Sequence, residues 1–550
     1  MARAARWRSL RQPARYAALL AGALPVLAFP DANLEFLAWF GLVPGLLLMA
    51  RAPRPREAAV RGWWFGTGYL LAAMYWLTPN LGPGLLVVAI VLGFLWAGVG
   101  LAARATLAPP VRPARAAAGL LLVPSAWLVT EYLRSWQAIG GPWAVLGASQ
   151  WQHPAVLALA AVGGVWLVTF ALVAANTGIV IVIGGRGVAS RLAGAAGALL
   201  AVVAGPAAFA ATAPSPVAGS ATVALVQPGV IGSPARRLAA SERISAGPAV
   251  RHADLIAWGE SSVGFDLSTS PALLGQLRAL SAAVGTQILA NQDALNPAGA
   301  KAKVAVLIGR NGIAGEYVKS RLVPFGEYIP LRSELGWLTS ISRAAPNNMV
   351  AGDGAHVLHA TLRGGRPLTI GVLICFESAF PDMSRYDADH GARLIVYQTS
   401  DSTFQGSWAL AQHASLGALR AAETGRPVVQ AALTGDSAAF DSRGRLLSWL
   451  DRSRRGALVV RLGLPPAGTR TPFDRLGDYV PLTALAIVAV ALLAAGGGRI
   501  RRRGKRRNPG IPWNGPRPPD GRQAERPVPC PAPLDLPAPL DLPGPPAAGF

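Results

Sequence analysis

The sequence predicts a polytopic α-helical membrane domain of about eight transmembrane helices that carries an α/β domain on the outer side of the membrane. Composition is the first observation, because 52% hydrophobic residues, 14% charged residues and a mean hydropathy of +0.37 exceed the apolar character of ordinary soluble proteins. The second is the spacing of the arginines. The third is a long segment in which short β-rich runs alternate with amphipathic stretches. Part of the chain must therefore lie in a lipid bilayer.

Eight apolar stretches approach or reach the roughly 20 helical residues that cross the hydrocarbon core of a bilayer. They are residues 16–28, 36–50, 63–77, 85–103, 117–133, 155–183, 192–211 and 479–495. The first is short and follows an arginine-rich start, as in a secretory signal, but the further stretches favour an uncleaved signal-anchor. The predicted parts are a basic N-terminus over 1–15, a seven-helix membrane domain over 16–212 and an eighth helix over 479–497.

Basic residues fall in alternate connections between these stretches, whereas loops such as 29–35 and 78–84 contain none. The basic clusters lie at residues 3–15, 51–61, 104–115, 186–191 and 499–507. Because short cytoplasmic loops are enriched in Lys and Arg, both termini are predicted to be cytoplasmic and the segment 213–478 to be extracytoplasmic. The formal net charge of +23 is therefore mainly a topology signal, and no nucleic-acid partner is expected.

The end of the chain is rich in proline, and Ala-Pro-Leu-Asp-Leu-Pro occurs twice in succession between Ala532 and Pro543. Residues 498–550 are predicted to be a basic and then disordered cytoplasmic tail. This tail is either a passive spacer or a segment that binds an unknown partner through polyproline recognition. Of the two cysteines, Cys530 lies in this tail, so only Cys375 has surroundings that can adjust the reactivity of a thiol.

The segment 213–478 carries the pattern of an α/β domain. Strands are predicted at residues 221–227, 255–258, 287–291, 304–308, 368–374, 393–398 and 428–433, with a helix at 405–424 that Gly425 ends. These strands are almost continuously apolar, so both of their faces need to be covered. Because about 265 residues can bury a full core, packed α/β layers are expected.

Three chemically useful side chains lie after strands or in loops of this segment, where a scaffold presents groups to a substrate. Glu260 follows the apolar run Leu-Ile-Ala-Trp-Gly. Lys319 precedes an irregular loop up to Pro330, and Cys375 ends the run Leu-Thr-Ile-Gly-Val-Leu-Ile. Taken singly, each also has an ordinary explanation, as a surface acid, a solvated lysine and an inert core thiol.

Together these residues resemble the Glu-Lys-Cys triad of the nitrilase, or carbon-nitrogen hydrolase, superfamily, which follows the same order on an α-β-β-α sandwich. The run Lys-x-x-Leu-Val-Pro-Phe-Gly-Glu-Tyr-x-Pro, from Lys319 to Pro330, is more specific and resembles the signature of the apolipoprotein N-acyltransferases. Shorter segments that resemble this family begin at Glu131, Gly141, Val226, Gly425 and Thr471. The resemblance covers residues 15–495 and implies a nitrilase-like domain between the seventh and eighth of eight helices in a bacterial plasma membrane.

The resemblance also implies acyl transfer through a thioester on Cys375. A thiol is largely protonated at neutral pH, so Glu260 is expected to be its base. Lys319 is expected to lower the thiol pKa and, with a backbone N–H near Phe376, to stabilise the oxyanion. The implied acyl donor is a phospholipid, and the acceptor is the α-amine of the diacylglyceryl-cysteine of an apolipoprotein, in the last step of lipoprotein maturation. No cofactor is implied, and the usual zinc-binding motifs are absent from the sequence.

Two further carboxylates match positions of the family. Glu327 and Glu377 are expected either to orient Lys319 or the substrate amine, or to hydrogen-bond the backbone of their loops. Phe376 stands where a tyrosine is common in the family, and the stretch after Val226 lacks a tryptophan that some members carry. Both departures concern the positioning of the substrate.

The outer ends of the predicted helices carry polar and aromatic residues. Glu131 and Arg134 are expected to pair with each other or to contact a lipid headgroup. Trp136, Trp143 and Trp151 are expected to anchor the protein in the interfacial region of the bilayer.

Two other functions remain open at this stage. A membrane-tethered nitrilase-like amidase would pass the same thioester to water, but it leaves the Lys319–Pro330 signature unexplained. A non-enzymatic membrane protein with a degenerate domain would be expected to lack a residue of the triad, and none is missing.

Overall fold

The structure is a computed structural model that describes residues 13–212, 216–296, 299–340 and 345–507. Met1–Leu493 form one compact unit, which contains both the helical region and the α/β domain, and Ala494–Phe550 form a second. The predicted proline-rich tail, Cys530 and the first twelve residues of the basic N-terminus lie outside the described residues.

The N-terminal region is helical, with several short 3-10 turns between its helices. Its helices are α2 (Pro13–Ala23), α3 (Val43–Ala50), α4 (Pro55–Ala73), α5 (Thr78–Leu81), α6 (Gly84–Gly93), α7 (Ala97–Leu107), α8 (Pro113–Arg134), α9 (Pro154–Gly184) and α10 (Gly187–Ala211). Helix α17 (Tyr479–Arg507) follows the α/β domain and runs on past the predicted end at residue 497. The helical character predicted for the eight apolar stretches is confirmed.

Five helical segments of the described chain are long and apolar enough to cross a membrane. They are Gly84–Leu107, Pro113–Arg134, Pro154–Gly184, Gly187–Ala211 and Tyr479–Gly496. The apolar helices at Pro13–Ala28 and Glu35–Ala50 are shorter. The chain is therefore a membrane protein with several spanning helices, and the total of eight spans stays a prediction.

Twelve strands of the α/β domain form two six-stranded sheets. The first has the order β12-β1-β2-β3-β4-β5 and the second β11-β10-β9-β8-β7-β6. The strands of the first sheet are β1 (Ser220–Gln227), β2 (Leu255–Trp258), β3 (Ile288–Leu295), β4 (Lys301–Gly309), β5 (Gly312–Val318) and β12 (Gly456–Gly463). Those of the second are β6 (Leu358–Thr361), β7 (Pro367–Ile374), β8 (Leu394–Thr399), β9 (Val428–Ala432), β10 (Ser437–Phe440) and β11 (Leu446–Leu450).

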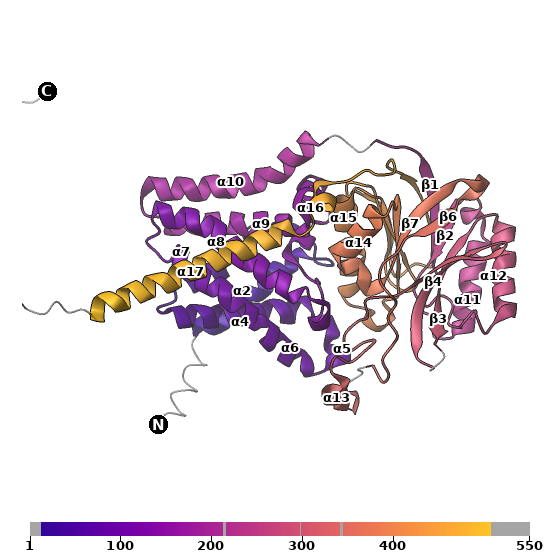
Figure 1. Ribbon diagram of the computed structural model, residues 1–550, viewed down its shortest axis with the longest axis horizontal. Coiled ribbons are helices and arrows are strands. Elements are labelled where there is room, and N and C mark those ends of the chain that lie inside the picture. Colours follow the sequence, from indigo (N-terminus) through magenta and orange to yellow (C-terminus); the bar gives the residue numbers. More distant parts are fainter. Residues whose placement is uncertain (1–12, 213–215, 297–298, 341–344, 508–550) are drawn as a thin grey trace, which may run out of the picture. The chain divides into compact units, whose positions relative to one another are not determined.

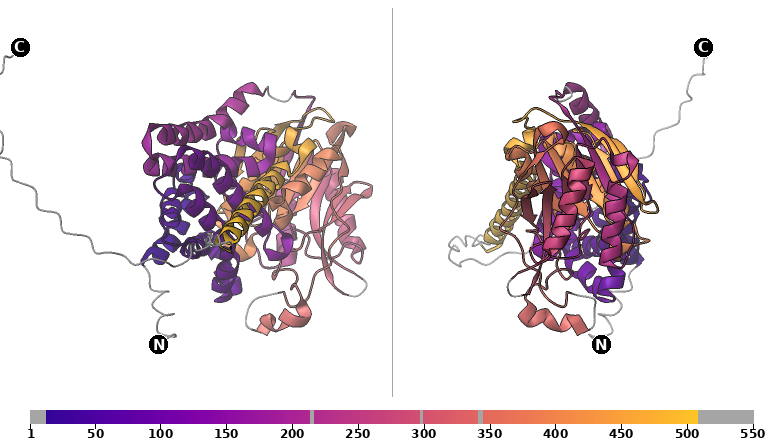
Figure 2. Two further views of the ribbon diagram at one scale, coloured as in Figure 1. Left: turned by 60° about the vertical axis from the view of Figure 1, so that its left-hand side comes forward. Right: turned by 90° about the vertical axis from the view of Figure 1, so that its right-hand side faces the viewer.

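Helices cover the outer face of each sheet, which gives the predicted α-β-β-α order of layers (Figure 1). Helices α11 (Pro234–Ser245) and α12 (Pro271–Val284) pack on the first sheet, and α14 (Pro381–Asp389) and α15 (Ala409–Thr424) pack on the second. An apolar core from both sheets, with Leu225, Leu289 and Val372 among its members, fills the space between them. Helix α15 also contacts α9, so the second sheet's helices lie on the side of the helical region (Figures 1 and 2).

Helix α9 is broken in its middle at Gly163 and Gly164, whose φ/ψ angles are not helical. Gly164 has a φ of +70°, and the ring of Phe473 from α16 (Pro472–Leu476) occupies the space that a Cβ atom would need there. The break leaves backbone N–H groups without helical partners. One of them, the N–H of Val165, donates to Oε1 of Glu423 on α15 at 2.7 Å. A residue of the α/β domain therefore caps the broken membrane helix.

This capping carboxylate makes stability depend on pH. Burial raises the pKa of Glu423 from an ordinary 4.5 to about 7, against the opposing effects of Arg420 and of the Val165 N–H. A raised carboxyl pKa stabilises the fold fully below about pH 4.5, and this contribution is lost as the pH rises through about 7. Glu423→Gln removes this titration and keeps an acceptor for Val165.

The free energy of unfolding of Glu423→Gln is therefore expected to fall less than that of the wild type between pH 4.5 and pH 7, by up to about 3 kcal/mol. Thermal unfolding of the purified protein in detergent at a series of pH values measures this difference. The exposed Glu334→Gln provides the matched control. Parallel curves for wild type and Glu423→Gln would contradict the assignment.

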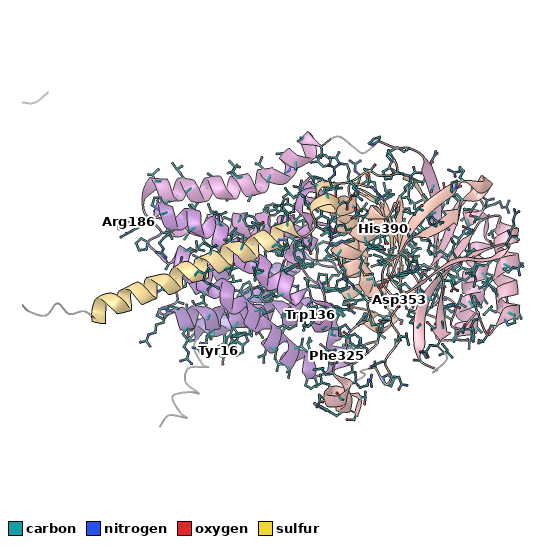
Figure 3. The ribbon with its side chains drawn as sticks, in the orientation of Figure 1. Tyr16, Trp136, Arg186, Phe325, Asp353 and His390 are labelled. Carbon is teal, nitrogen blue, oxygen red and sulfur yellow. The ribbon has the colours of Figure 1, made fainter. Side chains whose placement is uncertain are left out.

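The structure overturns the predicted surface roles of two tryptophans and of a charged pair. Trp143 and Trp151 are 8% and 5% exposed. The first donates through Nε1 to Gln412 of α15 at 3.0 Å, and the second packs on Trp449 of β11 with ring centroids 5.4 Å apart. Both join the helical region to the α/β domain, so they are not interfacial anchors. Trp136, 68% exposed, is free to be one (Figure 3).

Glu131 and Arg134 form no salt bridge with each other in the described part of the chain. Glu131 instead accepts hydrogen bonds from the N–H of Leu146 at 2.8 Å and from Nε1 of Trp127 at 2.9 Å. Both charged residues are almost fully buried in the protein, so neither contacts a headgroup. The charges of Glu131 and Arg134 act on each other, but the loop after α8 folds back and takes Oε1 of Glu131 as its acceptor, so the predicted pairing is not a direct ion pair.

Candidate active site

The three residues of the predicted triad follow strands that end at one edge of the sandwich. Glu260 follows β2 and Lys319 follows β5. These strands run in the same direction, because β2 is parallel to β3 and two antiparallel pairings then lead through β4 to β5. Cys375 follows β7 of the facing sheet, and Nε2 of Gln398 on the neighbouring β8 donates to the carbonyl of Trp258 on β2 at 2.9 Å. The two sheets are thus tied together beside the site.

Lys319 is the buried cation of the site. Its side chain is 0% exposed, and Nζ donates to Oε1 of Glu260 at 3.1 Å and to Oε1 of Glu327 at 2.7 Å. Burial alone would lower the pKa of Lys319, but the charges of Glu260 and Glu327 raise it well above its usual value. Lys319 is therefore an ammonium ion at neutral pH. The ammonium group of Lys319 is thus held between the carboxylates of Glu260 and Glu327, as expected if Glu327 orients Lys319.

Cys375 is half-buried and is the free cysteine of the described residues. Its backbone has a φ of +52°, an uncommon conformation for a side chain other than glycine. Burial raises the pKa of the Cys375 thiol well above its usual value, and the Glu260 charge adds to this effect, which Lys319 only partly opposes. The charge of Lys319 therefore lowers the thiol pKa, as expected, but burial and the Glu260 charge outweigh this effect. The resting thiol is protonated and needs a base when it reacts.

Glu377 braces the two loops that carry Lys319 and Cys375. Its Oε1 accepts from the N–H groups of Ser320 at 2.8 Å and Arg321 at 3.0 Å and from the Tyr317 hydroxyl at 2.7 Å. Its Oε2 accepts from the N–H of Ile374 at 2.8 Å. Because Glu377 is fully buried and accepts from these groups and from the Ser320 hydroxyl at 3.0 Å, the geometry matches the backbone-bracing alternative.

Phe376 is buried and packs edge-on against Phe380, with ring centroids 4.9 Å apart. The loop after α8 lies against both rings at Gly141, where a Cβ atom would come within 2.8 Å of each. Gly141 has a φ of +69°, which glycine adopts without strain. The glycine therefore lets the helical region touch the residue that follows Cys375.

A pocket of about 420 Å³ opens beside the Lys319 loop. Its lining includes Trp136 and Gln137 from the helical region and Ser320, Leu322 and Tyr328 from the α/β domain. Both regions contribute to it, so a molecule held there touches the segment that follows α8 and the α/β domain at once. Cys375 itself is not part of the lining.

Two polar residues that the sequence did not single out lie against Cys375, the predicted nucleophile. His413 of α15 has Nε2 3.1 Å from the carbonyl oxygen of Cys375, and its Nδ1 is 2.9 Å from Oδ1 of Asp401. Asp401 comes two residues after β8, as Glu260 comes two residues after β2. This strand-end position was the available signal for Asp401. His413 lies within the helix predicted at residues 405–424, in which no functional residue was predicted, so nothing in the sequence pointed to it.

Comparison with known proteins places this geometry in a family. Residues 21–178 match the apolipoprotein N-acyltransferase N-terminal domain, and residues 222–468 match the carbon-nitrogen hydrolase domain. Curated apolipoprotein N-acyltransferases are similar over nearly their whole lengths. That of Geobacter metallireducens is 30% identical over 87% of this chain and 94% of the relative, and that of Rhizobium meliloti is 31% identical over 80% and 88%.

This chain belongs to the apolipoprotein N-acyltransferase family. The two matched segments of this N-acyltransferase family member coincide with its helical region and with its two-sheet domain. Among solved structures, the chain is similar to an amidase from Nesterenkonia sp., at 20% identity and a TM-score of 0.33 over 46% of this chain and 92% of that one. The family, the enzyme class and the combination of a helical region with a nitrilase-like α/β domain, all predicted from the sequence, are confirmed.

Proposed function

We propose that this enzyme transfers a fatty acyl chain from a phospholipid to the α-amine of the diacylglyceryl-cysteine at the N-terminus of apolipoproteins, with Cys375 as the acyl carrier. The supporting observation is the buried Lys319 ammonium, which contacts Glu260 and Glu327 and whose charge acts on the Cys375 thiol. A cation, a base and a nucleophile at one strand edge are the groups that acyl transfer requires.

In the first half-reaction, Sγ of Cys375 attacks the carbonyl carbon of the acyl ester while Glu260 takes the thiol proton. The Lys319 ammonium and the N–H of Phe376 stabilise the oxyanion that forms. When the tetrahedral intermediate collapses, its carbon–oxygen bond to the glycerol breaks. The departing alkoxide takes the proton from Glu260 and leaves as lysophospholipid. The raised pKa of the resting thiol makes this coupled proton transfer necessary.

In the second half-reaction, the α-amine of the acceptor attacks the thioester carbonyl. An α-amine has a pKa near 8, so Glu260 can remove the proton that becomes acidic as the carbon–nitrogen bond forms. The same cation and N–H group stabilise the second oxyanion. The carbon–sulfur bond then breaks, the Cys375 sulfur recovers a proton from Glu260, and the product is an amide.

The proposed placement is a bacterial plasma membrane, with the termini in the cytoplasm and residues 213–478 on the outer side. Arg186 lies at the end of the helices far from the α/β domain, whereas Trp136 lies toward that domain (Figure 3). Arginine is retained in short cytoplasmic connections, so this arrangement supports an outward α/β domain. Both acyl-bearing substrates then reach the site from the outer leaflet through the region of Trp136.

The function is tested with purified enzyme, a phospholipid labelled in its acyl chain and a synthetic peptide that begins with diacylglyceryl-cysteine. The expected product is the N-acylated peptide, with one lysophospholipid formed for each amide, as identified by mass spectrometry. Release of labelled free fatty acid without amide would favour the membrane-tethered amidase. Absence of any acyl loss from the phospholipid would favour the non-enzymatic alternative.

A further inference from the structure

We propose that His413, held by Asp401, is a positioning residue that fixes the peptide between Cys375 and Phe376 so that the Phe376 N–H points at the oxyanion. This inference rests on the proposed function, because it assigns the orientation of one of that function's two oxyanion donors. His413 does not touch the reacting atoms in this role. It acts through the carbonyl group of Cys375.

The contacts of His413 are buried and directional. The residue is 2% exposed on α15. Its Nε2 lies 3.1 Å from the carbonyl oxygen of Cys375 and 3.0 Å from Oγ of Ser378. The Ser378 hydroxyl donates to the same carbonyl oxygen at 2.8 Å. Two side chains therefore converge on one backbone acceptor, directly at the nucleophile.

The partners of His413 define its protons. A carbonyl oxygen only accepts hydrogen bonds, so Nε2 carries a hydrogen that it donates to Cys375. On the other side of the ring, Nδ1 lies 2.9 Å from Oδ1 of Asp401, and an ionised carboxylate also only accepts. Burial alone would lower the pKa of His413, but the charge and hydrogen bond of Asp401 raise it. Both ring nitrogens thus face an acceptor, and the raised pKa favours the imidazolium form of His413 beside Asp401.

Fixing this carbonyl also fixes the next N–H. A trans peptide is planar, with its C=O and N–H pointing in opposite directions. Hydrogen bonds from His413 and Ser378 to the Cys375 oxygen thus aim the Phe376 N–H away from α15. Cys375 has a φ of +52°, a strained conformation that persists only where its surroundings hold it. The contacts of His413 and Ser378 with the Cys375 carbonyl oxygen hold the backbone in this conformation.

Two further contacts hold Asp401 and His413 in place. The backbone N–H of Asp401 donates to the carbonyl of Thr434 at 3.0 Å, which ties the Asp401 backbone to the segment that follows β9. On the other side, the Trp143 indole packs edge-on against the His413 ring, with centroids 5.4 Å apart. Because Trp143 belongs to the helical region, the orientation of His413 depends on contact between that region and the catalytic domain.

Two reactions of Cys375 distinguish an effect on the position of the oxyanion donor from an effect on the thiol itself. Acylation by a p-nitrophenyl fatty acyl ester passes through an oxyanion, and the burst of nitrophenol gives its rate. Alkylation by iodoacetamide passes through none and reports the reactivity of the thiolate. Both are measured on the full-length enzyme in detergent for wild type, His413→Ala, His413→Gln and Ser378→Ala.

His413→Ala is expected to slow acylation by roughly 10²–10³-fold, as loss of an oxyanion donor does, with alkylation within about threefold of wild type. His413→Gln places an amide N–H donor where Nε2 lies. Its acylation rate is therefore expected to be at least about tenfold higher than that of His413→Ala. Ser378→Ala, which removes the second donor, is expected to slow acylation selectively by about tenfold. It provides the test should His413→Ala fail to fold.

Equal losses of acylation and alkylation in these variants would overturn the inference, because His413 would then act on the thiol or on the integrity of the site. Wild-type acylation in His413→Ala, or in Ser378→Ala where the histidine variant does not fold, would overturn it as well. If wild-type enzyme formed no acyl-enzyme at all, the proposed function would fail before this inference was reached.

Discussion

Replacement of Cys375 by alanine is expected to abolish formation of the acyl-enzyme and to reduce acyl transfer to below about 10⁻³ of wild type, since the Cys375 sulfur carries the acyl group in the proposed intermediate. The side chain is half-buried and small, so the change leaves folding and membrane insertion intact. Intact-mass analysis after incubation with phospholipid measures the effect. Wild-type protein gains the mass of one acyl chain, and Cys375→Ala gains none.

Cys530→Ala is the matched control, because the chain has two cysteines and this one lies in the predicted tail. It is expected to acquire the acyl mass as wild type does. Cys375→Ser replaces the thiol by a hydroxyl of similar size, which tests whether any loss comes from the missing thiol nucleophile or from a cavity. Full turnover by Cys375→Ala would refute a thioester on this residue.

The central strands could be predicted because they are apolar on both faces. Strand β2 was predicted with its observed ends, and all four of its residues are buried. By contrast, β5 and β11 pack at sheet edges and have mostly exposed or half-exposed residues. Their sequences lack the continuous apolar run that reveals a buried strand. The break in α9 was not predicted, because glycines such as Gly163 and Gly164 are tolerated in apolar helices. Only the contacts with Glu423 and Phe473 explain the break.

The candidate site was predictable to the extent that its residues follow strands. Glu260, Lys319 and Cys375 are at such ends, and the structure brings the first two into contact. The buried state of Lys319 could not be predicted, since it depends on how two sheets close over it. The same holds for His413 and for Trp143, whose partners lie far away in the chain. The strand-end pattern indicated these groups, whereas long-range packing sets their charge and orientation.

Replacement of Lys319 by methionine is expected to be the other change with a large effect, acting on both stability and activity. The variant leaves Glu260 and Glu327 as buried carboxylates without their shared cation. Removing one partner of a buried ion pair typically costs about 3–5 kcal/mol. Loss of the cation that faces the oxyanion is expected to reduce acyl-enzyme formation by about 10³-fold or more. Thermal unfolding and the nitrophenol burst measure the two effects separately.

The double variant Lys319→Met/Glu327→Gln distinguishes a structural lysine from a catalytic one. Glu327→Gln removes one of the two unpaired charges, and its amide still has an oxygen to accept from the N–H of Val323, which is 2.9 Å from Oε2 in the wild type. Part of the lost stability is therefore expected to return, while acyl-enzyme formation stays as low as in Lys319→Met. Lys301→Met, at an exposed position, controls for the loss of a lysine elsewhere in the same sheet. Recovery of activity together with stability would mean that Lys319 serves only to neutralise the buried carboxylates, and oxyanion stabilisation would then rest on the Phe376 N–H alone.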